Sequence, residues 1–371
     1  MIRYPAFLST SISFLFTALL AGCHHGPVPV TTLNETVVYR LVEPLFNAGQ
    51  DSRIMVIQAG KSQAELLFEK KGYCIGCHAY SSTGLVALNV KKGKDRRFVV
   101  IKFEEKGISL FDAKKIGEFS FMAWSPDSRY LAMAVNTFGV IDIKNDVREP
   151  FNLRYQSGDV AIYDTTTKEI KLLPGASEMD FVEDMPAWSP DGKELLFVKY
   201  KSGKDAPIDS MSIYRIPFNN GAGGTPELVV SASGSGDCNY FPNYSPDGKW
   251  ISFVKGDGSQ GVFARPSSDI YLISRSGGTP RKLSLNTDGA MDSWHRWARD
   301  GRRLMFSSKR GGGMTALYIS SIDDPGNAAP PVRISEHAGM KVNLPEFVSR
   351  LPLGGTNRFS EIINGIFSEG K

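Results

Sequence analysis

Ala187-Trp188-Ser189-Pro190-Asp191-Gly192 is the stretch that decides the fold, because related segments recur along the chain. Pro and Gly on either side of an Asp favour a tight turn, since Pro fixes its φ angle and Gly tolerates a positive φ. The other copies are Ala123-Trp124-Ser125-Pro126-Asp127-Ser128, Asn243-Tyr244-Ser245-Pro246-Asp247-Gly248 and Arg296-Trp297-Ala298-Arg299-Asp300-Gly301. Each copy predicts a turn between an inner strand that ends in an aromatic residue and the strand that follows it.

Alternating apolar segments follow each turn and predict further strands. The first set covers residues 130–135, 194–200, 250–255 and 303–309, and the second set covers 160–164, 212–218, 269–274 and 316–322. Antiparallel four-stranded units that repeat in this way are typical of a β-propeller, whose blades bury their faces against one another. The units exceed the usual ~40–50 residues, which predicts inserted loops such as 136–158.

Two degenerate units extend the pattern toward both ends of the chain. Tyr80-Ser81-Ser82-Thr83-Gly84 with 85–90 resembles one copy, and Asn343-Leu344-Pro345-Glu346-Phe347 resembles a last inner strand. The outer strands of that last blade are expected from 37–42, 53–58 and 64–68, since strands from both termini in one sheet remove the exposed edge. We predict an all-β propeller over 36–350 with six blades of four antiparallel strands, seven being the alternative, and a tail over 351–371.

The N-terminus carries an export signal. Arg3 precedes an apolar run over 11–20, which is too short to span a bilayer. Leu20-Ala21-Gly22-Cys23 resembles the bacterial lipobox, in which the Cys is lipidated and becomes the new N-terminus. We therefore expect a signal peptide over 1–22, lipidation at Cys23 and a linker over 23–35. His24 in place of Asp favours the outer membrane under the lipoprotein sorting rule; a plain cleaved signal with an incidental Cys is the alternative.

Composition excludes several classes of protein. The net charge of +4 is spread along the chain without a basic stripe interleaved with aromatic residues, which argues against a nucleic-acid partner. No second apolar run of spanning length follows the signal. Four Cys are too few for a disulfide scaffold, and Cys238 is expected to be a buried apolar thiol.

Cys74-Ile75-Gly76-Cys77-His78 is the segment that carries chemistry. Its spacing is that of the c-type haem signature, in which two thiols form thioethers with one edge of the porphyrin and the next residue ligates the iron. Export agrees with this reading, because attachment takes place outside the bacterial cytoplasm. We expect one covalent haem c on Cys74 and Cys77, with His78 as proximal ligand. The alternatives are a redox dithiol, half of a zinc site and a structural disulfide loop.

The second axial ligand is sought among residues in register with His78. Alignment of the inner strands on their aromatic residues places Met122 and His295 at that level, each two residues before its aromatic residue. His295 lies two blades from His78, whereas Met122 lies in the adjacent blade. Either residue is a candidate distal ligand, and an open iron is the third possibility. His24, His25 and His337 are outside candidates.

Three acidic residues precede inner strands and form a weaker constellation. Asp184, Asp237 and Asp292 each stand just before an inner-strand aromatic residue. Capping of a local turn by the carboxylate is the favoured interpretation. A ring of carboxylates that binds a cation at one mouth of the channel is the alternative.

The Trp-Ser-Pro-Asp-Gly repeats resemble the PD40 (WD40-like) repeats of TolB, the periplasmic propeller of the Tol-Pal envelope system, over about 36–350. The extra N-terminal domain of TolB is lacking, and Cys-x-x-Cys-His at the start of a blade, together with 291–297, is typical of a TolB-like subgroup. This resemblance implies an envelope location and no substrate. The predicted function is an envelope-anchored monohaem cytochrome that transfers electrons to an envelope redox partner. The alternative is a TolB-like module that binds an envelope protein and has a structural Cys pair.

Overall fold

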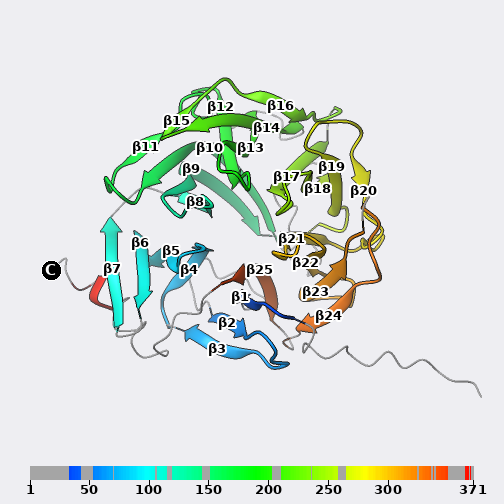
Figure 1. Ribbon diagram of the computed structural model, residues 1–371, viewed down its shortest axis with the longest axis horizontal. Helices are drawn as coiled ribbons and strands as arrows, with labels where there is room; N and C mark the ends of the chain where they lie inside the picture. Colours follow the sequence, from blue (N-terminus) through cyan, green and yellow to red (C-terminus); the bar gives the residue numbers. More distant parts are fainter. Residues whose placement is uncertain are drawn as a thin grey trace, which may run out of the picture.

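The protein folds as a ring of β-sheets around a central axis in the computed structural model (Figure 1). Residues 33–42, 53–69, 71–104, 107–114, 119–143, 151–202, 210–234, 236–257, 265–323, 326–335, 337, 340–349, 364–366 and 368 are described. The lipobox Cys23, His24, His25 and most of 351–371 lie outside these residues. In the described part, no helix is long and apolar enough to cross a bilayer.

The described strands form four hydrogen-bonded sheets, the largest of which joins three consecutive units through two short parallel contacts. Within each unit the pairing is antiparallel, and each unit begins with an inner strand near the axis. The first two are β4 (Cys74–Tyr80), β5 (Leu85–Lys92), β6 (Asp95–Glu104), β7 (Gly107–Lys114), then β8 (Phe119–Trp124), β9 (Tyr130–Ile143), β10 (Phe151–Asp164), β11 (Ile170–Leu172). The next two are β12 (Phe181–Trp188), β13 (Glu194–Lys201), β14 (Ser210–Asn219), β15 (Ala222–Gly223), β16 (Glu227–Val230), then β17 (Asp237–Tyr244), β18 (Trp250–Asp257), β19 (Asp269–Ser274), β20 (Arg281–Lys282). The last two are β21 (Asp292–Trp297), β22 (Arg303–Ser308), β23 (Ala316–Ser321), β24 (Val332–Ser335), then β25 (Lys341–Val348), β1 (Thr36–Val42), β2 (Arg53–Ile57), β3 (Glu65–Glu69).

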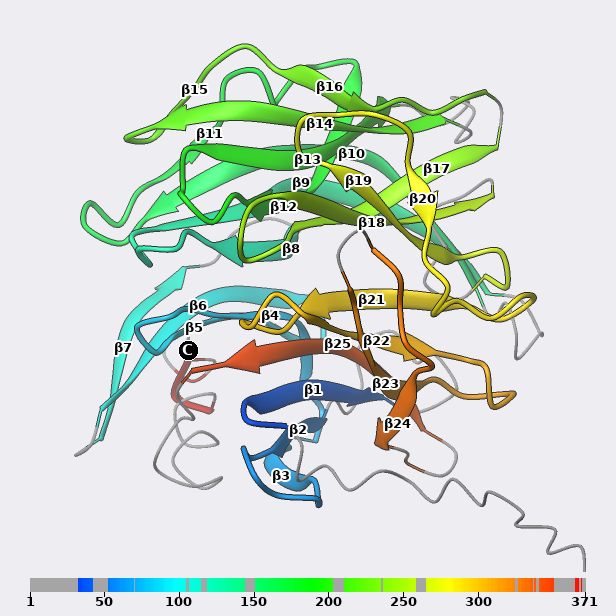
Figure 2. The same cartoon turned by 45° about the vertical axis from the view of Figure 1, so that its right-hand side comes forward.

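Strands from the two ends of the chain share one sheet. β25 pairs antiparallel with β1, with Val37 opposite Phe347 and Leu41 opposite Val342, and β2 and β3 continue the sheet outward. Figure 2 shows β25 and β1 side by side below β21. The pairing satisfies edges that would otherwise be exposed. The all-β propeller, closed by strands from both termini, is therefore confirmed.

The same hydrogen-bonded turn follows the inner strand in the three Ser-Pro-Asp copies and ends the strand there. In one turn the Ser189 hydroxyl donates to Asp191 Oδ1 at 2.6 Å, and the same oxygen accepts from the Lys193 amide at 3.1 Å. Gly192 follows with a φ of 68°, a conformation that costs little for Gly. Ser128 takes the corresponding position of another copy with a φ of 61°.

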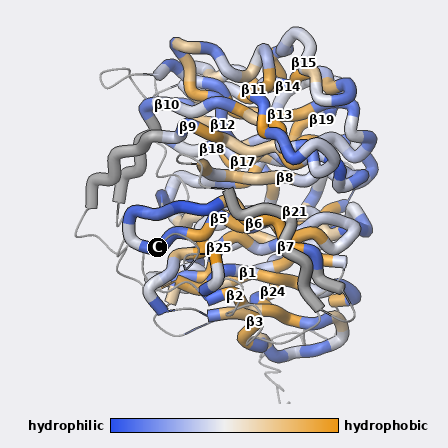
Figure 3. The backbone as a smooth tube through the Cα atoms, turned by 90° about the vertical axis from the view of Figure 1, so that its left-hand side faces the viewer, coloured by the Kyte–Doolittle hydropathy of each residue, from blue (hydrophilic) through white to orange (hydrophobic). Residues whose placement is uncertain are grey.

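The repeated aromatic residue links neighbouring units. Trp188 donates its indole N–H to the Ala123 carbonyl of the preceding unit at 2.9 Å, and Trp124 donates to the Ala79 carbonyl of the unit before that at 3.1 Å. Hydrophobic residues recur along the strands (Figure 3), and their buried side chains form the core between blades. The aromatic residue thus buries apolar area and satisfies a polar group of the adjacent inner strand at once.

Candidate functional site

Each inner strand bends at the same level, three residues before its aromatic residue. The pairing register shifts there, for example between Ser120 and Met122 in β8 and between Asp184 and Ala187 in β12. Five residues at this level have positive φ angles although they are not glycine: Phe121 (36°), Met185 (55°), Phe241 (48°), Trp294 (52°) and Leu344 (51°). Such angles cost on the order of 1–2 kcal/mol per residue, so the surrounding packing has to hold them. Cys77 takes the corresponding position in β4.

These six residues, Cys77, Phe121, Met185, Phe241, Trp294 and Leu344, are called the axial ring below. Phe241 stacks on Trp294 with ring centroids 4.6 Å apart, and Phe121 meets Phe241 edge-on at 5.5 Å. The Phe121 amide lies 3.3 Å from Cys77 Sγ. The bends therefore bring apolar and sulfur-containing side chains from separate blades into contact near the axis.

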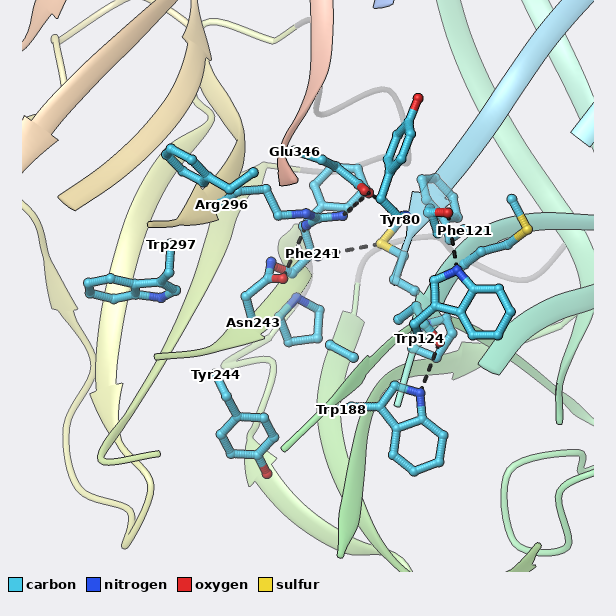
Figure 4. Close-up of a pocket in the computed structure, with 18 of the residues that line it drawn as sticks. Tyr80, Phe121, Trp124, Trp188, Phe241, Asn243, Tyr244, Arg296, Trp297 and Glu346 are labelled. Carbon is cyan, nitrogen blue, oxygen red and sulfur yellow. Dashed lines mark hydrogen bonds and ion pairs between the residues drawn. The ribbon is translucent and has the colours of Figure 1, made fainter. Parts of the chain in front are cut away.

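A cavity of about 370 Å³ lies on the turn side of the axial ring. We call it the axial cavity, and all six inner strands contribute to its lining (Figure 4). Five axial-ring residues line it, all except Trp294. Its walls are aromatic residues and prolines: Tyr80, Trp124, Trp188, Tyr244, Trp297, Phe347, Pro126, Pro190 and Pro246. The wall indoles are fixed by hydrogen bonds to neighbouring blades, so the cavity is largely preformed.

One ion pair joins two neighbouring inner strands in the lining of the axial cavity. Arg296 Nη1 donates to Asn243 Oδ1 at 3.1 Å and to the His295 carbonyl at 3.3 Å, while Nη2 lies 3.7 Å from Glu346 Oε1. The other carboxylate oxygen of Glu346 accepts from the Tyr80 amide at 3.2 Å. Burial raises the pKa of Glu346 to about 7, although the nearby Arg296 acts in the opposite direction. Figure 4 shows the Arg296 and Glu346 side chains pointing toward each other from the neighbouring strands β21 and β25.

The residues of the haem signature lie on β4 but in different surroundings. Cys77 belongs to the axial ring, and burial raises the pKa of its thiol to about 11. Cys74 lies three residues earlier on the strand, where Arg40 Nη2 approaches its sulfur at 3.3 Å. His78 is 4% exposed, and neither ring nitrogen has a hydrogen-bond partner. Burial lowers the pKa of His78 to about 3, so the ring is neutral at physiological pH.

The two predicted distal ligands have different positions. Met122 lines the axial cavity together with His78. His295 is buried against the preceding unit, and its Nε2 lies 2.9 Å from the Ser252 hydroxyl. In the unit that precedes β4, Val38 of β1 takes the position equivalent to Ser252. Val38 has no hydroxyl group, so His78 lacks the hydrogen-bond partner that His295 has. The structure therefore brings Met122, and not His295, to the cavity that His78 lines, while ligation by either residue stays a prediction.

The three acidic residues form local contacts. Asp184 accepts from the Met185 amide at 2.7 Å, Asp237 from the Ser233 amide at 3.1 Å and Asp292 from the Thr287 amide at 2.7 Å. The bonds of Asp237 and Asp292 close the loops before their strands, and that of Asp184 stays within the bend. None is the bond to the amide two residues on that forms an Asx turn, so turn capping stays a prediction. Within the described residues, no group of three or more His, Cys, Asp or Glu side chains is placed to hold a metal ion.

Cys238 was expected as a buried thiol. The structure places it in the core of the fourth unit, fully buried. Cys74, Cys77 and Cys238 are all free thiols.

Sequence reasoning missed Arg296, Asn243 and Glu346 as cavity residues. One sequence signal was available. The residue before the repeated aromatic residue is Ala in two Trp-containing copies, whereas Glu346 takes this position in the last inner strand.

Comparison with known proteins supports the fold. No family model matches the sequence. TolB from Acinetobacter baumannii superimposes with a TM-score of 0.57 at 18% identity, over 85% of this chain and 66% of that one. The chain has a TolB-like β-propeller fold. A protein from Lactobacillus plantarum also superimposes on this TolB-like propeller, with a TM-score of 0.52 at 11% identity, over 85% of this chain and 99% of that one.

A curated relative of the TolB-like propeller is the uncharacterized protein Atu1656 of Agrobacterium fabrum. It is 27% identical over 151 residues, which are 41% of this chain and 43% of that protein. The chain thus spans less than half of this relative and 66% of the A. baumannii TolB. At these identities the comparisons show the propeller fold alone.

Proposed function

We propose that this TolB-like propeller is a binding module of the bacterial cell envelope that takes an extended segment of a partner protein into the axial cavity. The observation that carries the proposal is a preformed cavity on the turn side of the axial ring, lined by aromatic residues, prolines and two arginines, Arg296 and Arg299. Aromatic residues and Arg are enriched where protein partners bind most strongly. The volume of about 370 Å³ lies at the lower end of the ~300–1,000 Å³ typical of ligand pockets.

Preorganisation supports a binding role. The indoles of Trp124 and Trp188 are fixed by hydrogen bonds to inner strands, and Trp297 donates to the Ser252 hydroxyl at 2.8 Å. Fixed side chains lose little conformational entropy when a ligand arrives, which favours affinity. The export signal and Cys23 place the module in the envelope, tethered by lipid, with the outer membrane favoured by His24.

Photo-crosslinking tests this proposal directly. A photoreactive aromatic amino acid at position 347, where Phe347 lines the axial cavity, is expected to capture a defined partner in cells of the source bacterium. The same amino acid at position 228, where Leu228 is 54% exposed on the outer strand β16, serves as control. The captured segment, made as a synthetic peptide, should bind the purified protein. Identical adducts from both positions, or a captured segment that does not bind, would contradict the proposal.

A second candidate function is the covalent attachment of haem c, which the unpartnered His78 favours. Buried polar atoms nearly always have a partner, and both nitrogens of His78 lack one. Cys77 and His78 line one cavity, where they would hold the group, and bound haem supplies one-electron chemistry. Cys74 is less well placed for thioether formation with the same haem. Three residues of extended strand span ~10 Å, so attachment of both thiols requires β4 to bend more sharply than it does between Ile75 and His78.

Haem attachment predicts a covalent, coloured product. Protein matured in a host with cytochrome c assembly machinery should keep a haem-staining band through denaturing electrophoresis, because thioethers survive unfolding. Cys77→Ala should lose most of the stain, whereas Cys238→Ala, which alters a thiol in the core of another blade, should keep it. A colourless wild-type band from a competent host would exclude haem attachment.

A further inference from the structure

We infer that the axial cavity recognises a carboxylate next to an apolar side chain, as at the C-terminus of a peptide, and that Arg296 is the residue that binds it. The inference rests on the proposed binding function and specifies the chemistry of the segment bound. It depends on the position of the guanidinium, on the apolar floor and on the carboxylate that stands opposite.

The Arg296 guanidinium is fixed and yet accessible. Nη1 is held by the Asn243 side chain and the His295 carbonyl, and the side chain is 35% exposed. Nη2 lies 3.7 Å from Glu346 Oε1, beyond the ~2.7–3.2 Å of a hydrogen bond. A planar guanidinium in a fixed orientation binds a carboxylate with two parallel hydrogen bonds. Because both Nη1 donors are occupied, Arg296 leaves Nε and Nη2 as the donor pair for a ligand carboxylate.

The floor beneath this guanidinium is apolar. Phe121, Met185, Phe241 and Leu344 of the axial ring line the cavity. The aromatic members of the ring pack against one another and hold the floor in place. A carboxylate at Arg296 places the adjacent side chain of the ligand within the same cavity. An apolar side chain there removes hydrocarbon surface from water, at ~25 cal/mol per Å². The arrangement thus matches a terminal carboxylate on an apolar residue better than an internal polar segment.

Glu346 occupies the position of an internal competitor. Its carboxylate faces Arg296 from β25 while its other oxygen binds the Tyr80 amide. A ligand carboxylate has to share Arg296 with this group, and two carboxylates in one buried site favour protonation of one of them. Ligand binding is therefore expected to drive proton uptake by Glu346.

The expected pH dependence follows from the groups that face Glu346. Its pKa is raised to about 7 by burial, so it becomes neutral as the pH falls from 8 to 6. Arg296 faces it from β21. His78 on β4 is neutral because its pKa is lowered, and Tyr80 is neutral because its pKa is raised. Val38 faces Glu346 from β1. The affinity for a carboxylate ligand should therefore increase as the pH falls from 8 to 6, because the competing charge on Glu346 is lost.

Calorimetry on the full mature chain tests the inference with matched probes. Acetyl-tetraalanyl-phenylalanine with a free carboxylate is compared with its C-terminal amide and with octanoate. The acid is expected to bind about tenfold more tightly than the amide, equivalent to ~1.4 kcal/mol. Arg296→Gln should abolish the difference, and Arg296→Lys should keep part of it. Arg215→Gln, which breaks a comparable 2.8 Å ion pair with Glu227 on outer strands, should leave it unchanged.

Glu346→Gln separates ligand recognition from a structural ion pair. If Arg296 binds the ligand, this variant should bind the acid more tightly at pH 8 and lose the pH dependence. If the pair only supports the fold, Glu346→Gln and Arg296→Gln should weaken binding alike, which overturns the inference. Equal affinity for acid and amide also overturns it and leaves the proposed function standing. Binding of octanoate without either peptide, or of none of the probes, overturns it too, while crosslinking decides the proposed function separately.

Discussion

Replacement of Trp188 by Ala is expected to lower the free energy of unfolding by about 3–5 kcal/mol, the range for truncating a buried Trp. Trp188 is 8% exposed and meets Phe218 edge-on with ring centroids 4.7 Å apart. Its indole also donates to the Ala123 carbonyl at 2.9 Å, which joins two neighbouring blades. The variant loses apolar burial, an aromatic pair and an interblade hydrogen bond together. Urea unfolding followed by circular dichroism measures the loss.

Trp188→Phe is the matched control for this prediction. Phe keeps most of the apolar contact and removes the N–H donor, which leaves the Ala123 carbonyl without that partner. The expected loss is about 1–3 kcal/mol, the cost of an unsatisfied buried polar group. If Trp188→Ala lowers the free energy of unfolding by less than Trp188→Phe does, the aromatic residue does not link the blades.

The Cys23→Ser variant is expected to leave the membrane fraction almost completely. Without the thiol no acyl chain can be attached, and buried acyl chains contribute about 0.8 kcal/mol per methylene to membrane binding. The wild-type protein should sediment with membranes after a high-salt wash, and the variant should remain in the supernatant. Immunoblotting of the two fractions measures the distribution.

His25→Ser is the control for Cys23→Ser, because it changes a neighbouring residue and leaves the lipobox intact. It should sediment with membranes as the wild-type protein does. Membrane sedimentation of Cys23→Ser after the salt wash would contradict a lipid anchor at this residue. Density-gradient separation of the wild-type protein then tests the outer-membrane assignment that follows from His24.

The repeats allowed the propeller fold to be predicted from sequence because the signals are local. Pro190, Asp191 and Gly192 close a turn by contacts within a few residues, and the apolar alternation beyond them defines which strand face is buried. The closure of the ring followed from the same pattern, since the last inner strand lacked outer strands and 37–42 supplied them. These inferences need only the chain's own periodicity and the rule that sheet edges are covered.

Alignment of the inner strands predicted which residues lie at the same height along the axis as His78. It did not predict the direction in which their side chains point. Met122 and His295 share a level with His78, but only Met122 lines the axial cavity. Both residues lie at the bend of their inner strand, so the backbone alone does not separate them; the His295 ring instead contacts the Ser252 hydroxyl of the preceding unit at 2.9 Å. No local sequence signal marks a bend at a residue such as Trp294, whose positive φ is unusual for a bulky side chain.

By itself, the sequence determined the propeller fold and predicted an export signal, a lipobox and a haem signature, because each of these patterns is written in consecutive residues. Only the tertiary structure decided that Arg296, Asn243 and Glu346 share one cavity and that His78 lies buried beside it without a partner. These residues come from different blades. Their proximity depends on closure of the ring, which places inner strands distant in the sequence around one axis. Burial near that axis then raises the pKa of Glu346 and lowers that of His78.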